Sequence, residues 1–470
     1  MHPFRRDLLR LSLAAAVLPS EGRGQAARDA GAEALRNRPG GGSEPTPILF
    51  LHGNGDHAAL WLTTLWRFES NGWPRERLHA VNFPDPLARD DDAVPQPGRS
   101  SSAEQTEYLI REIAAVRERT GAARVALAAN SRGGNVIRDY ATRIEGGAAL
   151  VSHAVLCGTP NRGVYDWPEI RNREFNADGD LLRRLNGGPT DVVPGTVFLT
   201  LRSDANDLFA QPRAVWSPAS PTRPTGTDTD GPALRGATNL VLPGLDHRET
   251  AYHPRAFAEI FAFVAGRAPE RVAVVPDARP VLDGLVTGEP GGAQTNRPVA
   301  GAVVEVFRTD PETGARLGEA LHRRTTGADG RWGPVAVAPD WALEIVLAPP
   351  PGSAAAPTTH FYRSAFPRSS GVVHLRFARP LAEAERRGDG GVVLMTRPRG
   401  YFGVPRDALL FNGQVPADVP RGIPRVAVAT LRLPASDLGR PVAALFNEER
   451  VVARAWPAAE NRIAVAELTG

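Results

Sequence analysis

The chain has 470 residues, of which 42% are hydrophobic and 23% are charged, as in an ordinary globular protein of roughly three domains. The formal net charge is only +3, and no concentrated basic patch is interleaved with aromatic residues, which excludes nucleic acid as an expected partner. Cys157 is the only cysteine, which excludes an intramolecular disulfide. Because Cys157 ends the apolar run Ala154–Leu156, we expect it to be a buried packing residue.

The N-terminal segment has the pattern of an export signal. A basic head with the pair Arg5-Arg6 precedes the apolar run Leu11–Pro19, which is too short to span a bilayer as a helix. The paired arginines resemble the twin-arginine signal of bacteria, and an ordinary signal of the general secretory route is the alternative. We therefore expect residues 1–43 to be a signal peptide and linker, and the protein to be periplasmic or extracellular.

From residue 44 onward, predicted strands alternate with predicted helices. Ile48–Leu51 and Leu78–Phe83 are apolar runs of strand length, and Ala59–Phe68 has the spacing of a packed helix. Ser102 and Gln105 resemble a capping box at the start of the next helix. This alternation predicts an α/β domain over residues 44–266, with a doubly wound, mostly parallel sheet covered by helices on both faces.

The segment Arg124–Asn135 carries the strongest functional signal. Val125–Ala129 is a continuous apolar run, as expected of a strand buried on both faces, and the residues after Asn135 have the apolar spacing of a helix face. Ser131 lies between them, followed by Gly133, at a sharp strand-to-helix turn that would push its hydroxyl outward. A loop serine that only caps the helix is the alternative interpretation.

This turn resembles the nucleophile elbow of the serine α/β-hydrolases. Their Gly-x-Ser-x-Gly pattern stands here as Ala129-Asn130-Ser131-Arg132-Gly133, with alanine in place of the first glycine. The resemblance implies that Ser131 is the nucleophile. It also implies an oxyanion hole made of two backbone N–H groups, those of Arg132 and of Asn54 in the segment His52-Gly53-Asn54-Gly55.

The segment from Val164 to Gly195 interrupts the alternation of strands and helices. Aromatic and aliphatic residues are scattered there among polar ones without a clear period. Two interpretations remain open, a lid over an apolar acyl pocket and an ordinary helical insertion on the sheet.

The triad acid and base follow from the family's chain order of serine, acid and histidine. Asp207 comes after a predicted strand, and with Pro212 it resembles the family's acid loop. Asp204 in the same loop is the alternative acid. His247 follows the last predicted strand of the domain and is the implied base, with His253 as the alternative.

Beyond residue 266 the helical pattern stops and short apolar runs punctuated by proline and glycine predict an all-β region. Val281–Leu347, with the turn Thr326-Gly327-Ala328-Asp329-Gly330, resembles a carboxypeptidase-regulatory or transthyretin-like β-sandwich. We expect this sandwich over residues 267–350 and a second β-rich domain over 351–470. No convincing catalytic set is evident in either.

Together these features predict an exported serine carboxylic-ester hydrolase, similar to lipases and esterases, that cleaves lipid or other apolar acyl esters through an acyl-enzyme on Ser131. No metal or organic cofactor and no transmembrane span are expected, and the oligomeric state is left open. A microbial polyester depolymerase is the alternative enzyme. A non-catalytic binding or adhesion protein that uses the β-rich half is the alternative of another class.

Overall fold

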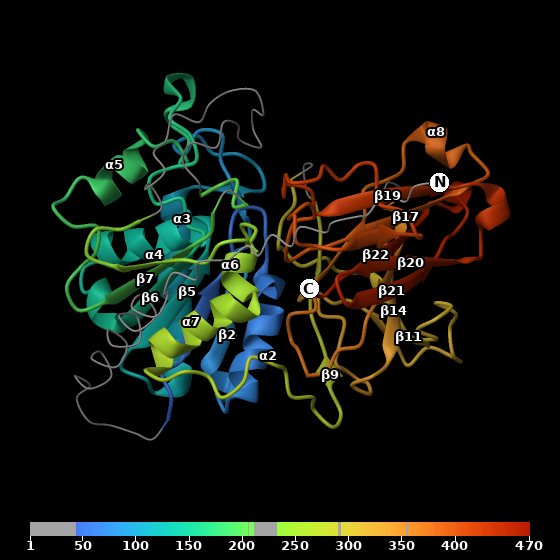
Figure 1. Cartoon of the computed structure of the whole chain (residues 1–470), viewed down its shortest axis with the longest axis horizontal. Coiled ribbons are helices and arrows are strands. Elements are labelled where there is room, and N and C mark those ends of the chain that lie inside the picture. Colours follow the sequence, from blue (N-terminus) through green and yellow to red (C-terminus); the bar gives the residue numbers. More distant parts are fainter. Residues whose placement is uncertain (1–43, 205, 211–232, 290–292, 354–355) are drawn as a thin grey trace, which may run out of the picture.

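The computed structural model describes residues 44–204, 206–210, 233–289, 293–353 and 356–470. The expected signal peptide and Pro212 lie outside the described residues. Figure 1 shows two bodies packed side by side, a helix-and-sheet body coloured from blue to yellow-green and a β-rich body in orange and red.

The first body is built on a six-stranded parallel sheet with the strand order β2-β1-β5-β6-β7-β8. Its strands are β1 (Ile48–Leu51), β2 (Leu78–Ala80), β5 (Val125–Asn130), β6 (Val151–Cys157), β7 (Val197–Arg202) and β8 (Thr238–Val241). The strands β1, β5 and β6 are buried along their whole length, which is why they read as continuous apolar runs. The predicted parallel α/β sheet is confirmed.

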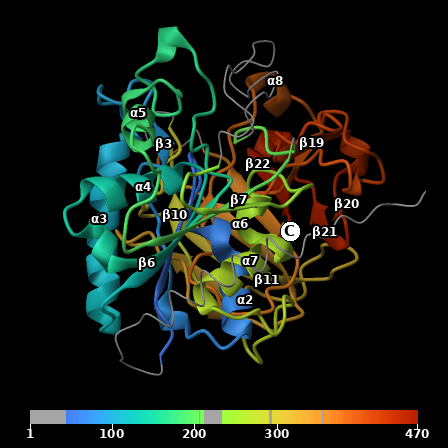
Figure 2. The ribbon, with the colours of Figure 1, turned by 60° about the vertical axis from the view of Figure 1, so that its left-hand side comes forward.

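Helices cover both faces of this sheet (Figures 1 and 2). They are α2 (Leu62–Ser70), α3 (Ser102–Thr120), α4 (Arg132–Arg143), α5 (Asp180–Asn186), α6 (Glu249–Tyr252) and α7 (Pro254–Ala265). Alternate residues of β1 face opposite sides, so that Phe50 packs with α2 and α7 while Leu51 packs with α3 and α4. The buried Cys157 packs in the first of these cores, and burial raises the pKa of its thiol, as expected of a packing residue.

The capping box of α3 lies one residue earlier than the sequence predicted. The Ser101 hydroxyl accepts the backbone N–H of Glu104, and the Glu104 carboxylate accepts the N–H of Ser101. Ser102 is the first residue of the helix, so its pairing with Gln105 is corrected. The two alternatives differ by one position in a run of serines, and local sequence does not separate them.

The second body contains a seven-stranded sheet with the order β12-β11-β14-β15-β22-β17-β19, a three-stranded sheet β18-β20-β21, and the pairs β10-β16 and β13-β9. Its strands are β9 (Val281–Leu282), β10 (Val286–Thr287), β11 (Val303–Thr309), β12 (His322–Thr325), β13 (Val335–Ala336), β14 (Ala342–Ala348), β15 (Thr358–Arg363), β16 (Leu375–Arg376), β17 (Gly391–Thr396), β18 (Leu409–Phe411), β19 (Val428–Leu433), β20 (Pro441–Phe446), β21 (Glu449–Arg454) and β22 (Arg462–Glu467). One short helix, α8 (Glu383–Arg386), and the first body's pair β3 (Leu87–Ala88) with β4 (Arg99–Ser100) complete the strands and α-helices described.

Strands from both sides of residue 350 share the large sheet. Strand β14 pairs antiparallel with β15, and β15 pairs parallel with β22 near the end of the chain. The segments 267–350 and 351–470 are therefore joined by backbone hydrogen bonds within one sheet.

The two bodies share an apolar core. Leu62 and Trp66 of α2 belong to the same cluster as Trp332 and Phe366 of the β-rich region, and the Trp66 indole donates to the Ser369 carbonyl at 3.0 Å. Within the described part of the chain, no helix is both long and apolar enough to cross a membrane.

Candidate active site

Ser131 occupies a strained turn between β5 and α4. Its backbone has φ 53° and ψ −124°, a combination that costs energy for a residue with a Cβ and is held in place by its surroundings. Gly133 and Gly53 have no room for a Cβ: at Gly133 it would lie 2.8 Å from the His52 carbonyl oxygen and 3.2 Å from the Ala129 Cβ, and at Gly53 it would lie 2.8 Å from the Ser131 Cβ. The alanine that replaces the family's first glycine therefore fits because Gly133 opposite it has no side chain.

The structure places Asp207, and not Asp204, beside His247. His247 Nδ1 lies 2.8 Å from Asp207 Oδ1, and both side chains are buried. Asp207 Oδ1 also accepts the backbone N–H groups of Phe209 and Ala210. Asp204 instead accepts N–H groups of Asn206 and Gly244, and these hydrogen bonds outweigh burial and lower its pKa.

His253, the alternative base, lies elsewhere. Its ring Nδ1 accepts the backbone N–H of Arg255 at the start of α7, and burial lowers its pKa to about 4. It does not line the pocket that holds His247.

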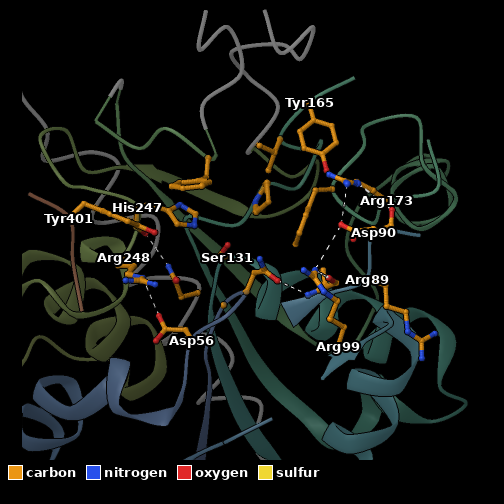
Figure 3. Close-up of a pocket in the computed structure, with 18 residues that line it drawn as sticks. Asp56, Arg89, Asp90, Arg99, Ser131, Tyr165, Arg173, His247, Arg248 and Tyr401 are labelled. Carbon is orange, nitrogen blue, oxygen red and sulfur yellow. Dashed lines mark hydrogen bonds and ion pairs between the residues drawn. The ribbon is translucent and has the colours of Figure 1, made fainter. Parts of the chain in front are cut away.

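Ser131 and His247 line one pocket of about 260 Å³, shown in Figure 3. Its apolar walls include Ala88, Val164, Tyr165, Phe175, Phe209 and Tyr401. No hydrogen bond joins Ser131 Oγ to His247 or to any other described residue. Such contacts are often long in a free enzyme and tighten when substrate binds. A hydroxyl and an imidazole on the wall of one largely apolar pocket can activate and attack a small carbonyl compound.

Near His247 the pocket is lined by Asp56, Arg248 and Tyr401, which the sequence did not predict as site residues. Arg248 Nε lies 3.2 Å from Asp56 Oδ2, and its guanidinium lies 4.9 Å from the centre of the Tyr401 ring. Phe209 contacts both His247, at 4.7 Å between ring centres, and Tyr401, at 5.8 Å. Asp56 and Arg248 directly follow predicted site motifs, but nothing in the sequence around Tyr401 links it to a site more than a hundred residues away.

The opposite side of the pocket is charged. Arg89, Asp90, Arg99 and Arg173 line it, and Figure 3 shows them across Ser131 from Arg248. Arg173 Nη2 lies 3.0 Å from Asp90 Oδ1 and Arg99 Nη1 lies 3.9 Å from the same oxygen. These charged residues were not predicted to line the site, because a run of arginine and aspartate is typical of a solvated loop.

The two residues expected to form the oxyanion hole lie close to Ser131. Asn54 lines the pocket, and its side-chain oxygen accepts the Ala88 N–H at 2.7 Å, which fixes this loop. Arg132 is the first residue of α4, where a backbone N–H has no partner within the helix. Both N–H groups are thus on segments held in place beside the nucleophile.

The Arg132 side chain ties the segment Val164–Gly195 to the elbow. Its guanidinium makes a two-pronged ion pair with Glu174, with N–O distances of 2.7 and 2.6 Å, and both side chains are buried. The remaining donors bind the carbonyls of Pro86 and Ser100. Burial raises the pKa of Glu174 against the opposing effect of Arg132. This part of the inserted segment is therefore anchored to the first residue of α4, directly after Ser131.

Two family profiles match the chain. Residues 45–160 match the profile described as "Lipase (class 2)", and residues 281–380 match the profile described as "Lipase C-terminal domain". The first match contains β1, the His52 segment and the elbow. The second covers most of the segment expected to be a transthyretin-like sandwich, so that expectation is not confirmed. No curated protein matches the chain.

Several solved structures are similar to parts of the chain. Aspergillus fumigatus lipase B is 14% identical over 48% of this chain and 54% of its own, with a TM-score of 0.34. Bacillus licheniformis lipase BlEst2 in its propeptide form is 16% identical over 67% and 76%, with a TM-score of 0.34. Carboxylesterase CesB from Bacillus subtilis is 16% identical over 52% and 99%, with a TM-score of 0.28. The chain spans about half the length of the Aspergillus lipase. At such low identities and TM-scores, these likenesses do not bear on the substrate or the site residues.

Proposed function

We propose that this chain is a carboxylic-ester hydrolase that cleaves acyl esters through an acyl-enzyme on Ser131. The matches of residues 45–160 to a class 2 lipase profile and of residues 281–380 to a lipase C-terminal profile support the proposal. The observation that carries the proposal is that the strained elbow serine lines one pocket with His247, whose ring is 2.8 Å from the buried Asp207 carboxylate. All three groups are needed for catalysis, because the Ser131 hydroxyl needs His247 as a base and His247 needs Asp207 as an orienting carboxylate.

The proposed reaction has two halves. His247 Nε2 takes the proton of Ser131 Oγ as the oxygen attacks the ester carbonyl, and Asp207 holds the ring in the required tautomer and stabilises its cation. The backbone N–H groups of Asn54 and Arg132 stabilise the negative oxygen of the tetrahedral intermediate. The histidine then gives its proton to the departing alcohol. Water, activated by the same histidine, releases the acid and restores Ser131.

The substrate class follows from the pocket walls. Val164, Tyr165 and Phe175 line the same pocket as Ser131 and offer apolar contact to an acyl chain, in which each buried methylene contributes ~0.8 kcal/mol. Export is part of the proposal and rests on the sequence of residues 1–43. Its test is whether the protein reaches the periplasm or medium, and whether replacing Arg5 and Arg6 by lysine retains it in the cytoplasm.

The activity is tested with p-nitrophenyl esters of increasing chain length, beside emulsified triglyceride and a polyester film. We expect turnover of the soluble esters by the wild type and its loss in Ser131→Ala, with circular dichroism confirming that the variant is folded. Undiminished turnover in Ser131→Ala would refute the role of Ser131. Turnover of the film far above that of the soluble esters would favour the depolymerase alternative.

A further inference from the structure

The loop that carries His247 contains two buried carboxylates. Asp246 precedes the histidine and Glu249 follows it by two residues, and both side chains are almost fully buried. Each caps the other's backbone: Asp246 Oδ1 accepts the N–H groups of Arg248 and Glu249, and Glu249 Oε2 accepts the N–H of Asp246. The turn that presents the histidine is therefore formed by two like charges close together.

Two arginines of the β-rich body balance the negative charges of Asp246 and Glu249. Arg397, the residue after β17, places Nη1 2.8 Å from Asp246 Oδ2 and Nη2 2.6 Å from Glu249 Oε1. Arg406 adds a second contact with Glu249 at 2.5 Å. These two arginines are the cations in ion-pair contact with the two carboxylates among the residues that the structure describes. Two buried carboxylates left with one cation fewer would repel each other in a poorly solvated site.

The surroundings of Arg397 are fitted to this role. Its guanidinium also donates to the Tyr252 hydroxyl at 3.0 Å and to the Tyr401 carbonyl at 2.6 Å. A Cβ at Gly400 would clash with the guanidinium carbon and lie 2.6 Å from Tyr252 Oη, so a side chain there would have to displace the guanidinium or the tyrosine hydroxyl. The segment continues to Tyr401, whose N–H donates to Asp246 Oδ2 at 2.7 Å and whose ring lies in the pocket, as Figure 3 shows.

We propose that Arg397 is a positioning residue for the reaction: by bridging Asp246 and Glu249 it sets the place of His247 relative to Ser131. The inference rests on the proposed function. Arg397 does not line the pocket that holds Ser131 and His247. It contacts the loop that carries His247 through Asp246 and Glu249. Its loss is therefore expected to displace His247 and to leave in place the pocket walls that bind the acyl group.

The expected signature is a fall in kcat with KM retained. A misplacement of about 1 Å can lower a rate by ~10²-fold, and a change in proton transfer without a change in substrate binding lowers kcat alone. We expect this loss in Arg397→Met with p-nitrophenyl acetate. Arg397→Lys should show a smaller loss, because one ammonium group cannot match the planar fork that holds two carboxylates.

The matched control is Arg399→Met. Arg399 is also buried, but its side chain donates to the carbonyls of Thr469 and Leu468 within the C-terminal body. Kinetic constants are compared per folded molecule, with folding checked by circular dichroism and thermal unfolding. We expect Arg399→Met to keep the wild-type kcat.

Full kcat in Arg397→Met, or an equal loss in Arg399→Met, would overturn the inference. If Arg397→Met does not fold, Arg397→Lys decides, and a wild-type kcat in that variant overturns it. A wild type that turns over no ester would instead refute the proposed function. The role of Arg397 is tested only by comparing the variants with an active wild type, so the two failures are distinguishable.

Discussion

At the scale of single residues, the site depends on which carboxylate reaches the histidine. The strand end after β7 offers Asp204 and Asp207 three positions apart, and the family's spacing favours Asp207. In the structure Asp207 contacts His247, while Asp204 closes the turn by accepting backbone and side-chain N–H groups. Gly158 has φ 55° and would bring a Cβ to 3.1 Å from Asp207 Oδ2, so its missing side chain makes room for the carboxylate.

This geometry predicts different effects for two conservative substitutions. Asp207→Asn should lower kcat by ~10⁴-fold, because an amide cannot hold the histidine in the useful tautomer or stabilise its cation. Asp204→Asn should reduce activity far less. The measurement is kcat on a soluble ester for both variants. A larger loss in Asp204→Asn would show that the acid is misassigned.

The motif residues were predictable because each follows an apolar strand at a fixed position in the family's order. Residues without such a neighbour were not predictable. Tyr401 and Arg397 come from a region whose strands pair over long separations, so their approach to His247 depends on the tertiary structure and has no local signature.

At the scale of elements, strand prediction succeeded where burial on both faces leaves a continuous apolar run, as in β1 and β5. It was less exact at edges: only Leu78–Ala80 pairs as β2 within the predicted Leu78–Phe83. The segment Val164–Gly195 could not be interpreted from its pattern. Its apolar stripe is the short one of α5, with Leu181, Leu182 and Leu185, and the buried ion pair between Arg132 and Glu174 leaves no periodic signal in the sequence.

We predict that Glu174→Gln is strongly destabilising. Removing one charge of a buried pair leaves the Arg132 guanidinium without a counter-ion and typically costs ~3–5 kcal/mol of unfolding free energy. It should also lower kcat, because Arg132 is the expected oxyanion donor. The control is Asp180→Asn in the same segment, whose pair with Arg183 is exposed and is worth at most ~1 kcal/mol.

Urea denaturation and ester turnover measure both effects. Equal unfolding free energies for Glu174→Gln and Asp180→Asn would show that the buried pair does not anchor the segment.

At the scale of the whole molecule, two histidines lie where the two bodies meet: His52 Nε2 lies 3.4 Å from Asn296 Nδ2, and the ring centres of His374 and His57 lie 5.6 Å apart. His52 Nε2 accepts the Phe83 N–H at 3.2 Å, and His374 Nδ1 accepts the Leu285 N–H at 3.0 Å. Burial lowers the pKa of His52 to about 4, and burial together with Arg376 lowers the pKa of His374 to about 3. Both rings therefore stay neutral in the folded protein at mildly acidic pH.

The sign of the resulting pH dependence follows from linkage. Below pH 6.5 the unfolded chain protonates these rings while the folded chain does not, so stability is lost as the pH falls from about 6.5 towards each folded pKa. For His374 alone the loss between pH 7 and pH 5 is at most about 2 kcal/mol, because the ring is only partly buried. His374→Gln, which keeps an acceptor for the Leu285 N–H, should therefore lose less stability than the wild type over this range.

Urea denaturation at pH 7 and pH 5 measures the difference, with His322→Gln on strand β12 as the control. An equal pH dependence in His374→Gln and the wild type would contradict a folded state in which His374 is neutral.

The proposed function requires Ser131 to be the nucleophile of an ester hydrolase. The most direct measurement is peptide mapping by mass spectrometry after reaction with a fluorophosphonate, which forms a stable bond with an activated serine. We expect one adduct per chain, on Ser131, that is absent from Ser131→Ala and forms much more slowly in Asp207→Asn. An adduct on another residue, or the same adduct mass in Ser131→Ala, would contradict this role of Ser131.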